Sequence, residues 1–387
     1  MRKIALILDH FFPHKGGAES AVYQLACFLR QKNYEVHILT QSYDPSLEEL
    51  FSFHVLKVRS KIGWLRILSF GWKVGKEVNK HSFDQVLGFN KTWRGMNYFQ
   101  PHGGTTRASR MQNVRVYRYR YERLLKQLLQ FFSFKQWIFL WIETQQYRNA
   151  HCTFLALSQM VKTHMQTFYH VPEERIQVIY NGVDVERFHP QERSKFRASL
   201  EQEFPQCQGK VLFLFVAHNF KLKGLNPLIE AFGNASLDRK KFLLLILGRG
   251  RQQSYLRLAQ KWNLAENLLF LKEDPDPEKY FCAVDAFVHP TFYDPCSLVL
   301  LEAMAAGLPC LTSRWNGAGE LLKHKQSGLI INDPWNISEM ALALEKLMNP
   351  EVRQSLGSAA RAIAEQIPWE SSFEKIEQVF QQRSARK

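Results

Sequence analysis

The chain has 387 residues, of which 45% are apolar, and it carries 51 Lys and Arg against 36 Asp and Glu. This length predicts two domains of ordinary size, and the composition excludes disordered and fibrous proteins. The six cysteines are scattered without a C-x-x-C pair, which favours a reducing cytoplasm over a disulfide framework or a zinc site. The apolar run 4–8 is too short for a signal peptide, and no run reaches about 18 residues, so no membrane-spanning helix is expected.

The first half of the chain alternates short apolar runs with helical patterns, which indicates a parallel, doubly wound sheet. Strands are expected at residues 4–8, 34–40, 53–58, 83–91, 153–158 and 176–180. Gly16 and Gly17, followed by Glu19, stand between the first strand and a predicted helix and would let a ligand approach the backbone. Asn90 and Lys91 end a later strand, where ligands bind in such sheets, and are candidates for the acceptor side.

Positive charge is concentrated in one window of the chain. Residues 51–150 contain 18 Lys and Arg but only four acids, nearly the whole excess of +15, which implies an acidic partner. Within this window, residues 107–148 alternate basic residues with aromatic and leucine residues, a pattern that suits helices in an anionic membrane interface. Two alternatives stay open. The stretch could be an insertion of two helices whose aromatics pack on the first domain, or a surface for single-stranded RNA.

The second half repeats the alternation of strands and helices after an Asn181-Gly182 turn and a Pro-bearing linker, which together mark a domain boundary. Strands are expected at residues 211–217, 242–247, 268–271, 283–288 and 327–331. Lys221 and Lys223 lie in the loop after the first of these strands, and Gly248 follows the second. The D-x-D pattern at 274–276 is assigned to a plain loop, because no strand hairpin flanks it, and no metal site is predicted.

The stretch 288–320, together with the strand 283–288 that leads into it, carries the strongest chemical signal. A buried strand leads through a polar turn with Asp294 into a helix that begins near Leu298, with Ser297 as its cap, and contains Glu302. A strand that feeds a helix in this way forms an anion site, because backbone N–H groups at the helix start have no intrahelical partner. The amides of Cys296 and Ser297 could then hold a diphosphate between the two acids.

This segment resembles the E-x7-E signature of the retaining glycosyltransferases of family 4, with Asp294 in place of the first Glu and Glu302 as the second. Ala-Met-Ala-Ala-Gly-Leu-Pro after Glu302 and Gly-Ala-Gly-Glu at 317–320 strengthen the resemblance, which extends over essentially the whole chain. It implies the GT-B fold, with two doubly wound Rossmann-like domains facing across a cleft. The domains would be 1–181 for the acceptor, with the insertion 107–148, and 182–366 for the nucleotide sugar. Residues 367–387 would form a helix that crosses back to the first domain.

The resemblance also implies roles for single residues. Lys223 matches a Lys that faces the donor diphosphate, whereas the usual Arg before it is replaced by Leu222, so that Lys221 could substitute for it. Glu302 would hold the ribose and Asp294 a sugar hydroxyl. His102 resembles a His of the first domain that lies beside the transferred sugar, although a structural His fits the pattern as well. The remaining substrate-binding candidates are Gly16, Gly17, Glu19, Asn90, Lys91, Gly248, Cys296, Ser297 and Leu298.

Within family 4 the chain resembles most the enzymes that add the first glucose to a heptose of the lipopolysaccharide core. This resemblance implies UDP-glucose as co-substrate without a separate cofactor, a lipid-linked saccharide acceptor and a retaining, metal-independent transfer. The expected workplace is the cytoplasmic face of the inner membrane, reached through the basic window 51–150, with no nucleic acid as partner. A different donor, such as UDP-N-acetylglucosamine or a GDP sugar, and a GT-B nucleotide-sugar epimerase are the alternatives.

Overall fold

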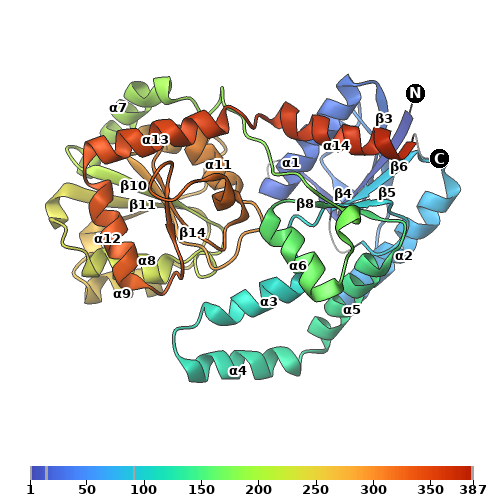
Figure 1. Cartoon of the computed structure of the whole chain (residues 1–387), viewed down its shortest axis with the longest axis horizontal. Coiled ribbons are helices and arrows are strands. Elements are labelled where there is room, and N and C mark those ends of the chain that lie inside the picture. Colours follow the sequence, from blue (N-terminus) through green and yellow to red (C-terminus); the bar gives the residue numbers. More distant parts are fainter. Residues whose placement is uncertain (1, 14–15, 90–91, 385–387) are drawn as a thin grey trace. The chain divides into compact units, whose positions relative to one another are not determined.

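The computed structural model describes residues 2–13, 16–89 and 92–384, which form two compact units (Figure 1). Unit 1 contains the described residues up to Val114, residues 119–181 and the C-terminal segment from Trp369. Unit 2 contains residues 182–368 together with the short segment Arg115–Arg118 from the middle of the basic stretch. Each unit is built around its own sheet.

Unit 1 holds a seven-stranded sheet in the order β5-β3-β1-β6-β7-β8-β9, in which every neighbouring pair is parallel. The strands are β1 (Arg2–Ile7), β3 (Tyr34–Thr40), β5 (Ser52–Val55), β6 (Gln85–Gly88), β7 (Tyr98–Phe99), β8 (Thr153–Ala156) and β9 (Ile176–Val178). A small separate ladder pairs β2 (His10–Phe11) with β4 (Ser42–Tyr43). Strand β1 is buried from Ile4 to Ile7 because helices cover both faces of a parallel sheet.

The helices of unit 1 are α1 (Gly17–Gln31), α2 (Gly63–Lys80), α3 (Thr106–Arg115), α4 (Arg120–Phe131), α5 (Phe134–Arg148), α6 (Gln159–Tyr169) and α14 (Trp369–Ser384). The last residue of α3, Arg115, already belongs to unit 2. The C-terminal helix α14 packs on the sheet of unit 1 through Phe373, Ile376 and Phe380, and the ring of Phe380 lies 4.7 Å from that of Tyr98. These apolar residues recur every three or four positions, which is why the helix presents one apolar face.

Unit 2 holds a six-stranded parallel sheet in the order β12-β11-β10-β13-β14-β15. Its strands are β10 (Val211–Val216), β11 (Phe242–Leu247), β12 (Leu268–Leu271), β13 (Ala286–His289), β14 (Cys310–Ser313) and β15 (Leu329–Ile331). Its helices are α7 (Arg193–Glu203), α8 (Leu225–Asn234), α9 (Gln253–Lys261), α10 (Glu278–Ala283), α11 (Leu298–Ala305), α12 (Ile337–Leu347) and α13 (Pro350–Ala364). This is the dinucleotide-binding strand order, in which the direction of winding reverses between β10 and β13.

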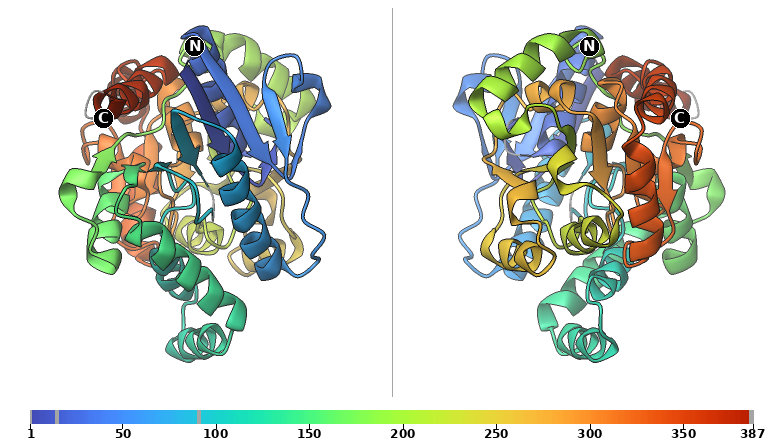
Figure 2. Two further views of the ribbon diagram at one scale, coloured as in Figure 1. Left: turned by 90° about the vertical axis from the view of Figure 1, so that its right-hand side faces the viewer. Right: turned by 90° about the vertical axis from the view of Figure 1, so that its left-hand side faces the viewer.

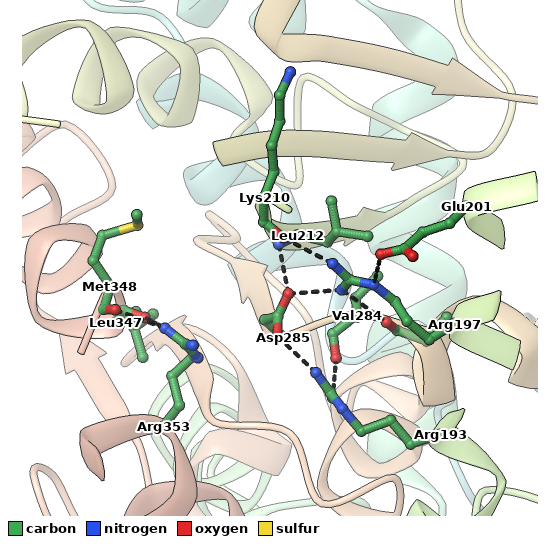
Figure 3. Close-up of polar contacts among 11 residues, drawn as sticks. Arg193, Arg197, Glu201, Lys210, Leu212, Val284, Asp285, Leu347, Met348 and Arg353 are labelled. Carbon is green, nitrogen blue, oxygen red and sulfur yellow. Dashed lines mark hydrogen bonds and ion pairs between the residues drawn. The ribbon is translucent and has the colours of Figure 1, made fainter. Parts of the chain in front are cut away.

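At the amino-terminal ends of the two middle strands, β10 and β13, a cluster of charges surrounds Asp285, which directly precedes β13 (Figure 3). Its carboxylate accepts hydrogen bonds from Arg193 at 2.6 Å and Arg197 at 2.9 Å, both on α7, and from the amide of Leu212 at 2.8 Å. Because Asp285 is largely buried, these donors replace the water that it loses. The cluster holds α7 against the amino-terminal ends of β10 and β13.

The basic stretch folds as three helices, α3, α4 and α5, rather than two. Helix α4 projects from the sheet of unit 1 (Figure 2) and has no buried residue. Within the described part of the chain, no helix is both long enough and apolar enough to cross a membrane.

Candidate functional site

Two loops of unit 2 meet at the switch point of its sheet, where β10 and β13 end. The amide of Phe292, after β13, donates to the carbonyl of Leu222, after β10, at 2.9 Å. Gly224 has φ +85°, and a Cβ at this position would lie 2.1 Å from the carbonyl oxygen of Pro290. The two loops therefore hold each other at backbone distance. Ligands bind at this place in doubly wound sheets.

Lys223 and Asp294 face each other across these loops. The Lys223 ammonium donates to Asp294 Oδ2 at 2.6 Å and to the carbonyl of Tyr293 at 3.1 Å. Both side chains are mostly shielded, with 18% and 15% of their surfaces exposed. Because an ammonium has three N–H donors, these two contacts leave one for a ligand. The structure thus brings together two of the residues predicted from the sequence.

Helix α11 begins at Leu298, and Ser297 caps it by accepting a hydrogen bond from the amide of Leu300 at 3.4 Å. The backbone amide of Ser297 donates to Asn316 Oδ1 at 3.4 Å, so this amide has a partner within the protein. Cys296 is buried beside it, and Leu298 is half-buried. A diphosphate at this helix start would have to share or displace the Asn316 side chain, which the sequence did not reveal.

Glu302 lies on α11, half-buried, and no described side chain donates a hydrogen bond to its carboxylate. Burial raises the pKa of Glu302 to about 7, while the charge of Arg187 lowers it and that of Glu278 raises it. A partly buried carboxylate without a donor is costly unless a ligand supplies one, so this group suits hydroxyl groups of a bound substrate.

Gly248 ends β11 in a conformation that only glycine adopts readily, with φ +135°, and a Cβ there would lie 1.9 Å from the carbonyl oxygen of Ala217. The neighbouring Arg249 forms an ion pair with Glu273, after β12, and His218 lies 2.8 Å from the same carboxylate. These polar groups therefore gather at the ends of the three strands β10, β11 and β12.

Lys221 is placed differently from Lys223. Its ammonium is exposed and lies 3.6 Å from the ring centre of Tyr117, in the short segment that belongs to unit 2. The same segment is held by Arg115, which pairs with Asp333 at 3.0 Å, and by Arg118, which pairs with Glu230. Lys221 is thus engaged with an aromatic ring.

In unit 1, the candidate residues lie at the carboxyl ends of the strands. Gly16 is the N-cap of α1 without a side-chain cap, Gly17 begins the helix, and Glu19 lies in its first turn. His102 is half-buried and contacts Gln100 Oε1 through Nε2 at 3.2 Å. Burial lowers the pKa of His102 to about 4, so its ring is neutral at pH 7. Asn90 and Lys91 lie outside the described residues.

A cavity of about 710 Å³ opens among the loops and helices of unit 1. It is lined by Asp9 after β1, by Phe89 after β6 and by the glycines Gly103 and Gly104. Three cations from three different helices also line it, namely Arg110, Lys126 and Lys135. These three residues show no common pattern in the sequence, because the helices that carry them are brought together only by the fold. The cavity is large enough for a saccharide.

Helix α4 and its neighbour α5 expose an unusual number of large apolar side chains. Leu124, Leu125, Leu128, Leu129, Phe131, Phe132, Phe134 and Trp137 have exposed fractions from 49% to 79%. The alternative in which the aromatic residues of this stretch pack on the domain therefore fails for Phe131 and Phe132, at the end of α4. Patches of this kind on a monomer mark interaction surfaces.

Comparison with known proteins agrees with this architecture. The family model described as "Glycosyltransferase Family 4" matches residues 15–187, and the model "Glycosyl transferases group 1" matches residues 197–363. Together the two models account for most of both halves of the chain.

Individual relatives point the same way. The chain is 24% identical over 364 residues to the lipopolysaccharide glucosyltransferase WaaG of Escherichia coli K12, covering 94% of each chain. The crystal structure of WaaG, described as a glycosyltransferase involved in lipopolysaccharide biosynthesis, superimposes with a TM-score of 0.82 at 23% identity and covers 97% of this chain and 99% of WaaG. HepE of Anabaena, solved with UDP and glucose, superimposes with a TM-score of 0.74 at 18% identity, covering 99% and 100%. The expected fold and family are thereby confirmed: the chain belongs to the family 4 glycosyltransferases and has the GT-B fold.

Proposed function

We propose that the chain transfers glucose from UDP-glucose to a heptose of a lipid-linked lipopolysaccharide core, with retention of configuration and without a catalytic metal. The observation that carries this proposal is the pair Lys223–Asp294, closed at 2.6 Å at the switch point of unit 2. The similarity to WaaG, at 24% identity, supports the choice of donor and acceptor.

The donor half of the reaction needs positive charge where the diphosphate leaves. Asp294 and the Tyr293 carbonyl hold the Lys223 ammonium in place before the substrate arrives, so little reorganisation is needed when negative charge develops. The positive end of α11 would add to this field, once the Ser297 amide is released from Asn316. Lys223 and the start of α11 would thus stabilise the negative charge of the leaving diphosphate, which a divalent metal would otherwise do.

The sugar and the ribose would be held by the two acids. Asp294 Oδ1 is left for a sugar hydroxyl, since Oδ2 binds Lys223, and Glu302 would accept hydrogen bonds from the ribose. Neither acid is placed as a nucleophile by these contacts. Transfer would therefore proceed by attack from the face of the leaving group, through an oxocarbenium-like state, with the departing phosphate accepting the proton of the acceptor hydroxyl.

The acceptor half is supported by the cavity of unit 1. Arg110, Lys126 and Lys135 on its wall outnumber the acids Asp9 and Glu143, and this excess of positive charge suits an anionic saccharide. Arg115 and Arg118, by contrast, are paired with acids of unit 2 and are thus less available to the RNA alternative.

A lipid-linked acceptor also requires that the enzyme reach the membrane surface. Helix α4 carries Arg120, Arg123 and Lys126 among exposed leucines and phenylalanines, and none of its residues is buried. This combination suits a helix that lies in the interface of an anionic bilayer. The chain would then be a peripheral protein of the cytoplasmic membrane face.

The test is transfer of labelled glucose from UDP-glucose to lipopolysaccharide that lacks its outer core, with and without added Mg²⁺ or Mn²⁺. Wild type is expected to transfer equally in all three conditions, and Glu302→Ala to lose transfer. Glu266→Gln is the matched control, because Glu266 is an exposed acid of the same unit and is expected to change nothing.

Transfer from UDP-N-acetylglucosamine or a GDP sugar, but not from UDP-glucose, would retain the enzyme class and replace the donor. Asp294 favours this alternative, since it is one methylene shorter than the Glu of the family and leaves a different space for the sugar. Turnover of a nucleotide sugar without any acceptor would instead indicate an epimerase.

A further inference from the structure

A chain of polar contacts runs along the edge of the sheet of unit 1. It consists of Glu35 and His37 on β3, His54 on the edge strand β5, Glu77 near the end of α2 and His81 directly after that helix. None of these residues lines the cavity of unit 1 or belongs to the proposed donor site. The structure therefore contains a cluster of metal-ligating side chains for which the proposed reaction has no use.

When each imidazole of this chain carries one proton, the hydrogen bonds fix which nitrogen carries it. Glu35 only accepts, so His37 Nε2, at 2.9 Å from it, carries the proton and His37 Nδ1 is an acceptor. His54 Nε2 must then donate to His37 Nδ1 at 3.1 Å. This leaves a bare lone pair on His54 Nδ1.

That lone pair faces an acceptor. His54 Nδ1 lies 3.1 Å from Glu77 Oε1, and a carboxylate ionised at neutral pH has no proton to offer. Two acceptors at this distance repel each other unless a cation lies between them. The position thus calls either for a proton on His54 or for a metal ion.

The arrangement of the third group favours a metal. His81 Nε2 lies 3.1 Å from the same Oε1 of Glu77, and the three ligand atoms all lie within 4.8 Å of one another. In a tetrahedral zinc site with bonds of 2.0–2.1 Å, ligand atoms are about 3.3 Å apart, close to both contacts of Glu77. The two imidazole nitrogens reach the same separation when the exposed ring of His81 turns toward the ion. The other Glu77 oxygen is held by Lys80 at 3.0 Å, which orients the carboxylate.

We propose that His54 Nδ1, Glu77 Oε1 and His81 Nε2 bind a Zn²⁺ ion, with water as the fourth ligand. His37 and Glu35 then form the outer shell that holds His54 in its ligating tautomer. His81 has 44% of its side chain exposed, which gives the ion access from solvent. Bound there, the ion pins the end of α2 to the edge strand β5, away from the transfer chemistry.

Only two of the three proposed ligands, Glu77 and His81, are spaced in the sequence as a metal-binding pair. Glu77 and His81 are four residues apart at the end of a helix and therefore face the same side. His54 is 23 residues earlier, a spacing that matches no zinc motif, so only the fold brings the third ligand to the pair.

The test uses untagged full-length protein that has been stripped of metal with a chelator. Zn²⁺ is then titrated in competition with a chromophoric chelator, which reports affinity and stoichiometry without reference to activity. We expect one equivalent of Zn²⁺ per chain, and a visible spectrum typical of four coordination when Co²⁺ replaces it.

His81→Ala is the first variant, because His81 is the most exposed ligand, and it is expected to lose the site. His170→Asn is the control, since it also removes an exposed histidine, at φ +52°, where asparagine is tolerated. Glu35→Gln, which touches no metal, is expected to weaken binding about 10–100-fold through His37 and His54.

Zinc affinity that is the same in His81→Ala and in His170→Asn would overturn the proposal, as would the absence of a stoichiometric ion. Either result would assign the position between His54 and Glu77 to a proton. Should His81→Ala fail to fold, the Glu35→Gln titration decides the question alone, because unchanged affinity in that variant contradicts the outer shell.

Discussion

The ammonium of Lys223 lies 2.6 Å from Oδ2 of Asp294, and the two residues come from loops that leave adjacent strands of the sheet of unit 2. The Asp294 carboxylate and the Tyr293 carbonyl hold the ammonium through groups of the protein itself, so unit 2 alone positions the cation at the proposed donor site. Such preorganisation removes much of the cost of arranging charge during the reaction.

Replacing Lys223 by Met is expected to lower kcat for glucose transfer about a hundredfold or more, by analogy with the loss of one donor to a developing charge. Lys221→Met is the matched control, two residues away, and is expected to stay within about threefold of wild type because its ammonium lies over Tyr117. Steady-state rates of transfer from UDP-glucose measure both. Equal losses in the two variants would mean that both lysines face the diphosphate.

The carboxyl group of Glu302 makes the stability of unit 2 depend on pH. Burial raises its pKa from 4.5 to about 7, so ionisation is disfavoured in the folded chain. Its contribution to stability is therefore fully present below about pH 4.5 and is lost as the pH rises through about 7. We expect the free energy of unfolding of wild type to fall relative to Glu302→Gln across this range.

Chemical denaturation of both proteins between pH 4 and 8 measures this difference. Saturating UDP-glucose is expected to diminish it in wild type, because ribose hydroxyls would stabilise the ionised form. Parallel pH profiles of the two proteins would show that Glu302 does not titrate in this range.

The sequence predicted most strands of the two parallel sheets, because buried strands such as Phe213 to Phe215 are continuous apolar runs between turn residues. The expected strands did not include β7 and β14, which are only two and four residues long. The sequence also singled out Asp294 and Glu302, which sit on one short loop and the helix that follows. These two acids could be found from the sequence because they are close together in the chain.

Contacts between distant parts of the chain could not be predicted in the same way. Asn316 reaches the Ser297 amide across 19 residues, and Arg115 reaches Asp333 across 218. The sequence allowed both Lys223 and Lys221 to face the diphosphate, and only the fold shows that Lys223 contacts Asp294 whereas Lys221 lies over Tyr117. The contact between His54 on β5 and Glu77 on α2 likewise could not be predicted from the sequence, because only the fold brings the two elements together.

Gly224 and Gly209 offer a test of the close contact between the two loops. Both have positive φ, +85° and +67°, so alanine strains the backbone at either position by about 1–2 kcal/mol. At Gly209 nothing lies within 4 Å of the added Cβ, whereas at Gly224 it would lie 2.1 Å from the carbonyl oxygen of Pro290. Gly224→Ala is expected to destabilise the fold further and to lower transfer, while Gly209→Ala affects stability alone. Urea denaturation and initial rates distinguish the two effects.

Asp285 is expected to matter for stability and not for the reaction. Asp285→Ala leaves Arg193 and Arg197 without their shared carboxylate and the Leu212 amide without an acceptor, which we expect to cost about 3 kcal/mol. Glu201→Ala, which removes only the outer partner of Arg197, is expected to cost less than about 1 kcal/mol. Denaturation curves measure these costs, and a large loss of kcat in folded Asp285→Ala would contradict a structural role.

The exposed apolar residues of α4, and Phe132 directly after it, are expected to bind a membrane surface. Leu129 and Phe132 are 62% and 79% exposed, so replacing both by Glu removes little from the folded core. In a bilayer interface each would bury an apolar side chain worth about 1.5 kcal/mol, and two such losses weaken binding about a hundredfold. We therefore expect that Leu129→Glu/Phe132→Glu no longer sediments together with vesicles of anionic phospholipid. Its unfolding midpoint is expected to be the same as that of wild type.

Leu342→Glu is the control, since Leu342 is also 59% exposed but lies alone on α12 of unit 2. It is expected to bind the vesicles like wild type, and binding of both proteins is expected to weaken with salt because Arg120, Arg123 and Lys126 flank the apolar face. If the double variant keeps its affinity, the leucines of α4 do not enter the bilayer. The double variant is also expected to lose transfer to lipid-linked acceptor while it still binds UDP-glucose, because the donor residues lie in unit 2 and the membrane contact serves only the acceptor.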